Sequence, residues 1–298
     1  ADKLSGMYKV DRENYEKYWD DISPFIKFGC LKDQKFQEKM KDFIIFKNLD
    51  DKYITLPEYV ENIKGKEDSE QPEVVDAEDV AKEEAGEETA GKEEEPTTVY
   101  YVTDIQQQGQ YINLFKEQGM DALILAHTID QPFITQLEQS EDVKVHFQRI
   151  DSDLSDSMKE EGDEETLKKQ TETLGDVFKK ALGKDQLEVQ VQNLKNENIS
   201  SMITLSEETR RMQDMMKMYS AGGMGMDTSM FGGGETLILN ANNALVKYIL
   251  DNTEGEHVDM FCKQLYDLAM LANKPLSAEE MTQFVARSNE IMLLLTQE

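Results

Sequence analysis

The stretches VYYVT (99–103), DALILA (121–126) and VKVHF (143–147) decide the fold class of this 298-residue chain. Each is a short apolar or alternating run, which is typical of a β-strand. Helical spacing fills the gaps between them, from Gln106 to Gln118 and from Asp130, the expected cap, to Leu137. This alternation predicts a small βαβαβ unit of three layers with a short parallel sheet covered by helices, and so an α/β chain.

The segments before this unit differ sharply in composition. Residues 1–64 carry aromatic and aliphatic side chains at mostly helical spacing, which predicts a helical packing unit. Residues 65–98 are acidic: from Lys66 to Glu95 there are 14 Asp or Glu, 3 Lys and no aromatic residue. Such a composition cannot bury enough apolar surface to fold, so we predict a disordered acidic insertion within a globular unit.

The segments after the βαβαβ unit at 99–150 predict a linker and a second domain. Residues 151–165 form another acidic stretch, which we interpret as an interdomain linker. Residues 166–298 are expected to form an α+β domain, with a helix at 167–182, a strand pair formed by 187–194 and 201–205, and a helix after 243 capped by Asn240 or Asn242. The sequence thus predicts two globular parts joined by the acidic linker at 151–165, with the acidic insertion inside the first part.

The end of the chain carries two apolar stripes at helical spacing. They predict a terminal helical hairpin with its turn at Pro275 and an N-cap at Ser277. A lone hairpin would leave these stripes partly exposed, so we expect a homodimer whose interface residues are Phe261, Leu265, Leu268, Ile291, Met292 and Leu295.

A methionine-rich segment after Ser206 predicts a protein-binding helix. Its apolar side chains fall within an arc of roughly 160°, interrupted by Arg211, while Arg210 and Lys217 lie on the opposite side. Flexible, polarizable methionines suit a surface that accepts dissimilar partners, and the glycine-rich loop that follows favours binding over ordinary core packing. The candidate binding residues are Arg211, Met212, Met215, Met216, Met218 and Tyr219.

Composition restricts the remaining functions. A net charge of −29 opposes binding to nucleic acid or anionic membranes, and no apolar run is long enough to span a bilayer. Cys30 and Cys262 stand far apart without a CxxC partner, so neither a zinc site nor a disulfide framework is expected, and a reducing cytoplasmic location fits best. The chain begins at Ala1 rather than Met, which is consistent with a fragment of a longer protein.

Motifs for catalysis are missing from the sequence. No phosphate-binding loop, dinucleotide fingerprint, HExxH pair or GxSxG elbow occurs, so we expect no catalytic, cofactor or metal residues in this chain. One rival hypothesis stays open: His127 and Asp130 follow a strand at the expected carboxyl edge of the sheet, where α/β enzymes commonly bind small ligands. A structural histidine is the alternative interpretation.

Five segments resemble, in the same order, the carboxyl-terminal part of the ninety-kilodalton heat-shock chaperone family, most like its bacterial form, high-temperature protein G. They are YWDDISPFIKFGCLKD (18–33), YITLPEYVENIK (53–64), VYYVTD (99–104), QGMDALILAHTIDQPFITQL (118–137) and ETLILNANNALVKYIL (235–250). No single segment is diagnostic, but together with the terminal helices they cover nearly all of the chain outside the acidic insertion.

The resemblance implies which domain each part of the chain forms. Residues 1–64 and 99–150 would be the end of the middle domain, and 166–298 the dimerisation and client-binding domain, with Arg211 to Tyr219 in the place of the client-binding helix. ATP and magnesium would belong to an N-terminal ATPase domain absent from this chain. The acidic insertion and the ending LLLTQE, without the EEVD tail of eukaryotic cytosolic members, depart from the family pattern. A purely structural dimerisation module is a further alternative.

Overall fold

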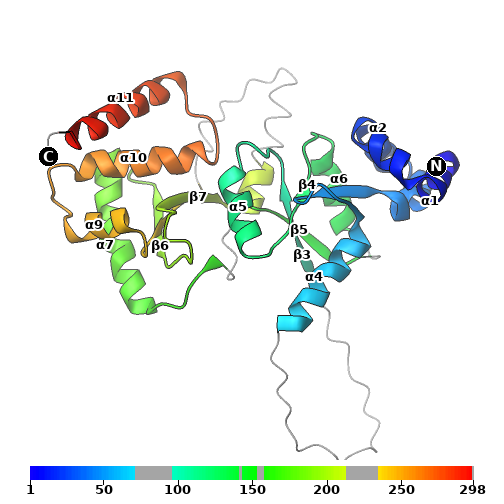
Figure 1. Cartoon of the computed structure of the whole chain (residues 1–298), viewed down its shortest axis with the longest axis horizontal. Coiled ribbons are helices and arrows are strands. Elements are labelled where there is room, and N and C mark those ends of the chain that lie inside the picture. The colour runs from blue at the N-terminus through cyan, green and yellow to red at the C-terminus, as the bar shows by residue number, and fades with distance from the viewer. Residues whose placement is uncertain (71–95, 141–142, 153–157, 213–233, 297–298) are drawn as a thin grey trace, which may run out of the picture. The chain divides into compact units, whose positions relative to one another are not determined.

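The computed structural model describes residues 1–70, 96–140, 143–152, 158–212 and 234–296 (Figure 1). The chain divides into two compact units, which are described separately. The first unit comprises residues 1–101 and 122–148, and the second comprises 102–121 and 149–298. Helices and two sheets make up both units, which confirms the predicted α/β class.

Helices dominate the start of the first unit. They are α1 (Asp2–Val10), α2 (Arg12–Lys32), α3 (Gln34–Met40) and the short 3-10 helix η1 (Lys41–Phe43). Helix α2 begins where the Asp11 side chain accepts a hydrogen bond from the Asn14 backbone, and it buries Tyr15, Trp19 and Cys30 in the core. The predicted helical packing is therefore present.

A β-hairpin interrupts this mostly helical region, and the helical packing unit predicted for residues 1–64 did not include it. Strands β1 (Ile45–Asn48) and β2 (Tyr53–Thr55) pair antiparallel. The Asn48 side chain closes their turn by accepting from the backbone nitrogens of Asp50 at 3.0 Å and Lys52 at 2.9 Å. Short strands carry too few residues for their period of two to stand out from neighbouring helical spacing.

The three predicted strands join this hairpin in one sheet. The sheet has the order β2-β1-β4-β3-β5, where β3 is Thr97–Val102, β4 is Leu123–Ile124 and β5 is Val145–Arg149. Helices α4 (Leu56–Glu70) and α6 (Asp130–Glu138) complete the unit. The predicted acidic insertion overlaps α4 and β3 at its ends, and its residues 71–95 lie outside the described residues.

The second unit contains a three-stranded sheet of order β6-β8-β7. Strand β8 (Glu235–Asn240) is parallel to β6 (Glu188–Gln192) and antiparallel to β7 (Ser201–Leu205). The predicted direct pairing of β6 with β7 is wrong, because β8 enters between them. The run TLILN in β8 is almost wholly buried, as expected for a central strand, and its continuous apolar pattern lacks the alternation that marks a strand in sequence.

Helices cover this sheet (Figure 1). Helix α7 (Glu164–Leu182) packs on β6, and α10 (Val258–Leu271) packs on β7 and α7. The core includes Phe178, Ile203, Leu237, Ile249 and Cys262. Helices α5 (Gly109–Glu117), α9 (Ala244–Asp251) and α11 (Ala278–Leu294) complete the unit.

The cap of α9 is Asn243, which corrects the prediction of Asn240 or Asn242. Asn243 accepts from the backbone nitrogens of Leu245 and Val246 at 3.0 and 3.4 Å. Asn240 is instead fully buried, where its amide accepts from Leu194 and donates to the carbonyls of Asn196 and Ile199. Three asparagines in five residues made the cap ambiguous in sequence.

Candidate protein-binding surfaces

Helix α11 exposes an apolar stripe on its own chain. It begins with a capping box, in which Ser277 accepts from the Glu280 backbone while the Glu280 carboxylate accepts from Ser277. The helix has no buried residue along its whole length. Its exposed apolar residues include Met281, Val285 and Met292, and the exposed Leu295 follows at its C-cap; we call these four residues the α11 stripe. Met281, Val285 and Met292 are 38%, 49% and 56% exposed.

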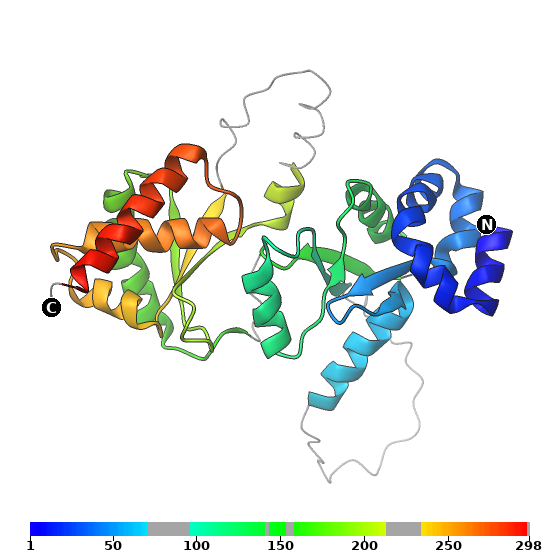
Figure 2. The ribbon, with the colours of Figure 1, turned by 45° about the horizontal axis from the view of Figure 1, so that its top comes forward.

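Neighbouring helices add to the apolar surface. Leu245 and Tyr248 on α9 and Leu268 on α10 are also exposed. Figure 2 shows α11 lying against α10 at this end of the unit, and hydrogen bonds join the two helices. The second unit therefore offers three helices with apolar side chains that the described part of the chain does not cover.

The predicted interface residues divide into three groups. Leu268, Met292 and Leu295 are exposed, while Phe261 and Ile291 are half-buried. Leu265 is only 2% exposed because it lies in the core with Phe178 and Cys262. A charge at Leu265 would disrupt the fold of its own unit, so this residue cannot serve to test an interface.

The methionine-rich segment is described only at its start. Residues 207–212 are helical, and the Ser206 hydroxyl accepts from the Thr209 backbone as expected for a cap. Met212 is 45% exposed, and Arg211 pairs with Glu207 at 2.8 Å. Met215, Met216, Met218 and Tyr219 lie outside the described residues.

Arg210 lies, by helical spacing, on the side opposite the methionines. Its side chain is buried, and its guanidinium lies 3.2 Å from the Asp151 carboxylate. The same carboxylate accepts hydrogen bonds from Arg149 at 2.6 and 2.7 Å. Burial disfavours the charge of Asp151, but the hydrogen bonds from Arg149 and the charges of Arg149 and Arg210 outweigh burial and lower its pKa.

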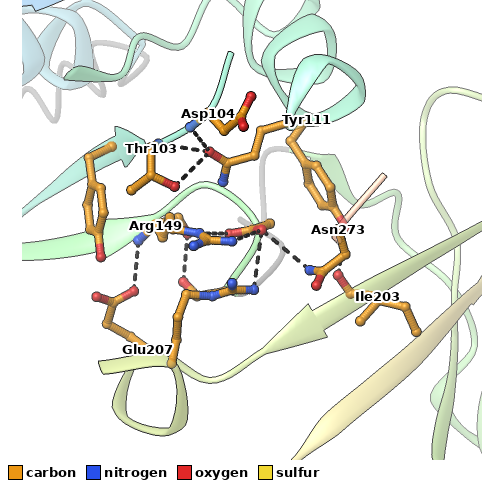
Figure 3. A network of polar contacts seen from close by, with 12 residues as sticks. Thr103, Asp104, Tyr111, Arg149, Ile203, Glu207 and Asn273 are labelled. Atoms are coloured by element: carbon orange, nitrogen blue, oxygen red, sulfur yellow. Dashed lines mark hydrogen bonds and ion pairs between the residues drawn. The ribbon is translucent and has the colours of Figure 1, made fainter. Parts of the chain in front are cut away.

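Figure 3 shows that this network joins several segments of the second unit. Glu207 accepts from the Arg149 backbone at 2.9 Å, and Asn273, just after α10, contacts Asp151 at 3.4 Å. Tyr111 on α5 donates to the carbonyl of Ile203 in β7 at 2.6 Å. The first turn of the methionine-rich helix is therefore anchored in a buried polar network.

Sequence reasoning missed this network because Asp151 opens a stretch that looked like a linker. In the structure Asp151, Ser152 and Met158 are buried, and Lys159 bridges to Leu194. The sequence does carry one signal for this network. Arg149 and Asp151 place charges of both signs together at the end of a strand, whereas a linker more often carries charges of one sign.

At the rival ligand site of His127 and Asp130, the Asp130 carboxylate is engaged by contacts within the first unit. Asp130 is buried, receives a 2.5 Å hydrogen bond from the buried Lys27, and accepts from the His127 backbone at 2.9 Å, so it does not act as the expected N-cap residue. The imidazole is half-exposed. A groove of about 840 Å³ in the same unit is lined by other side chains, including Gln37, Phe46 and Gln136. These contacts favour the structural interpretation of His127.

The described residues hold no group of His, Cys, Asp or Glu that is arranged to bind a metal ion. No helix in the described ranges is long and apolar enough to cross a membrane. Both cysteines are free and buried, and burial raises the pKa of Cys30 to about 11 and of Cys262 to about 12.

The fold and these surfaces define the class of protein. It is a two-unit α/β chain in which helices at the end of the second unit expose apolar side chains. A sequence model of the Hsp90 protein family matches residues 3–71 and 88–297. Because the match covers most of the sequence, the chain belongs to the Hsp90 family, as its motifs predicted.

Individual relatives agree with this assignment. The chaperone protein HtpG of Bacteroides thetaiotaomicron is 29% identical over 263 residues, covering 86% of this chain and 34% of its own length. HtpG of Porphyromonas gingivalis is 28% identical over 268 residues, covering 87% and 35%. HtpG of Buchnera aphidicola is 24% identical over 302 residues. The chain spans about a third of the length of the first two relatives.

Proposed function

We propose that this chain is a chaperone segment that forms a homodimer through α9, α10 and α11 and binds non-native client proteins. The α11 stripe carries the proposal, because a helix without a single buried residue has apolar side chains aligned along one side. Membership of a family whose relatives are named chaperones supports it. Within this proposal the chain works in the cytoplasm and has no nucleic acid or membrane partner.

The energetics favour a partner for α11. A helix of 17 residues is marginally stable by itself, and α11 lacks core contacts that would stabilise it. Burying four apolar side chains contributes at most about 6–12 kcal/mol per protomer. Two protomers together can therefore offset an association cost of about 4–15 kcal/mol. A second copy is the natural occupant, because a twofold interface presents the same stripe from both sides.

A charge placed in the stripe tests the dimer. Met292→Asp should raise the dimer dissociation constant at least 100-fold in sedimentation equilibrium, because the carboxylate would be buried against apolar side chains. Gln283→Asp adds the same charge to the same helix on the opposite, exposed side, and it should leave the dimer intact. Equal dissociation constants for both variants and the parent would disprove this interface.

We further propose that the helix beginning at 207 holds clients through its methionine side. Met212 supports this role, because it is half-exposed on a helix whose first turn is anchored by Arg210 and Glu207. A helix whose first turn is anchored can bind apolar segments through its exposed apolar side without losing its own packing. Two such helices in a dimer would increase effective concentration for a client that spans both.

An aggregation assay tests the client site. Replacing Met215, Met218 and Tyr219 together by Ser should weaken the suppression of client aggregation and leave the melting temperature nearly unchanged. The matched control replaces Gln213, Asp214 and Lys217 by Ser and should retain full suppression. A fall in melting temperature of the first variant would favour a core helix, and unchanged suppression would exclude these residues as the client site.

Nucleotide chemistry lies elsewhere in this proposal. ATP and magnesium would bind in a part of the longer protein that this chain does not contain, and the chain itself would need no cofactor. Calorimetry should then detect no ATP binding at micromolar concentrations. Stoichiometric binding would require a nucleotide site within residues 1–298.

A further inference from the structure

Three polar side-chain contacts join α11 to α10. Arg287 on α11 donates through Nε to Gln264 Oε1 on α10 at 2.9 Å, and its Nη2 pairs with Asp267. Gln264 Nε2 donates to the Ser288 hydroxyl at 2.9 Å. Gln264 therefore bridges two consecutive residues of α11. We call Gln264, Asp267, Arg287 and Ser288 the α10–α11 clamp.

The clamp is more than a surface ion pair. The side chains of Arg287 and Asp267 are only 12% and 16% exposed, whereas pairs in open solvent contribute little. Arg287 uses two different guanidinium nitrogens for two acceptors one helical turn apart on α10. Such a planar fork fixes direction as well as distance. The clamp can therefore determine how α11 is rotated about its own axis.

Apolar packing restrains α11 only weakly within one chain. Core side chains normally fix the rotation of a helix, but no α11 side chain is buried, and Phe284 and Ile291 are half-buried. At about 100° per residue, Arg287 and Ser288 lie on either side of these two residues, and the midpoint of the clamp is roughly 90° around the helix from the centre of Met281, Val285 and Met292. When the clamp holds Arg287 and Ser288 against α10, the α11 stripe lies to one side of α10. A rotation of α11 that broke the clamp could bring the stripe onto α10 instead.

We infer that the α10–α11 clamp positions α11 so that each protomer presents its apolar stripe to a second copy rather than to its own α10. This inference rests on the proposed homodimer, but its first consequence can be measured in the monomer. The clamp residues are positioning residues, since the stripe itself makes the contacts. Their loss should loosen α11 first and weaken the dimer as a result.

The test reverses the charge of Arg287 and then restores the pair. Arg287→Asp places two carboxylates together and should speed amide hydrogen exchange in α11 at least tenfold at dilutions where the chain is monomeric. It should also raise the dimer dissociation constant at least tenfold. The double variant Arg287→Asp with Asp267→Arg should recover most of both losses. Exchange in α7 and β8 should stay unchanged in every variant.

Lys195→Asp is the matched control. It makes the same change of charge at an exposed residue between β6 and β7, outside α10 and α11. It should affect neither exchange in α11 nor the dimer.

The outcomes separate the inference from the proposal on which it rests. A parent chain that stays monomeric, with faster α11 exchange in Arg287→Asp, would disprove the homodimer and keep the clamp. A dimeric parent with unchanged exchange and dissociation in Arg287→Asp would disprove the clamp and keep the dimer. Failure of the charge-swapped double variant to recover either property would also count against the clamp.

Discussion

At the residue scale, Asp151 places a charged carboxylate in the interior of the second unit. Its carboxylate is fully buried and is neutralised by two arginines, Arg149 and Arg210. Removing one partner from a buried charge pair leaves an uncompensated charge, which is far more costly than losing a surface pair. Arg149 and Arg210 can therefore stay buried only while the Asp151 carboxylate balances their charge.

Replacing Asp151 with Asn should lower the free energy of unfolding by about 3–5 kcal/mol, because two arginine charges would lose their counterion. Urea unfolding monitored by circular dichroism measures this loss. Asp185→Asn is the control, since Asp185 is exposed and should change stability by no more than about 0.5 kcal/mol. Similar losses in both variants would show that the network contributes little.

The acid sensitivity of the second unit should also depend on Asp151. Its pKa is lower in the folded chain than its ordinary value of about 4, so folding favours the ionised carboxylate. This contribution is present above about pH 4 and is lost as the pH falls through the lower folded pKa. Urea midpoints of the parent should therefore fall with acid more steeply than those of Asp151→Asn. Parallel pH profiles would contradict this assignment.

At the scale of single elements, the start of α9 separates two asparagines with different roles. Asn243 caps the helix, whereas Asn240 ties the end of β8 to three backbone groups of the connection between β6 and β7 from a fully buried position. A cap contributes about 1 kcal/mol, but a buried amide that serves several backbone groups leaves each of them unsatisfied when it is removed.

Asn243→Ala should therefore cost about 1 kcal/mol of stability, and Asn240→Ala at least about 2 kcal/mol. Thermal unfolding of both variants measures which substitution causes the larger loss of stability. Asn242→Ala provides a third comparison: its backbone nitrogen donates to Asn240, and its side chain donates to Glu160 and Leu194 near the surface. A larger loss for Asn243→Ala than for Asn240→Ala would reverse the roles assigned to them.

At the scale of the whole molecule, each compact unit has its own core and its own buried cysteine. Cys30 lies in the core of the first unit and Cys262 in that of the second. Burial raises the pKa of both thiols, so neither should form the reactive thiolate in the folded chain at neutral pH. Thiol labelling can therefore report the opening of each unit separately.

We expect Asp151→Asn to speed the labelling of Cys262 and to leave the labelling of Cys30 nearly unchanged. The physical reason is that the variant weakens only the network of the second unit. Peptide mass spectrometry after timed labelling in mild urea distinguishes the two cysteines. Equal acceleration at both would mean that the units unfold as one cooperative body.

Local patterns in the sequence determined the elements that have strong local signals. The strands around VYYVT and DALILA, the helix that ends at Gly119 and the Ser277 cap are all present in the structure. Periodicity and capping act over a few residues, so a single sequence carries them. The motif order also identified the family, because five segments in sequence order need no contact to be recognised.

Only the tertiary structure decided which elements meet. Strand β8 enters between β6 and β7, Leu265 turns into its own core, and Arg210 pairs with Asp151 across 59 positions of sequence. Each depends on burial and partner choice between distant segments, for which helical or strand periodicity provides no signal. The same reason explains α11: its sequence has the apolar stripe of a core helix, and only the fold leaves that stripe exposed.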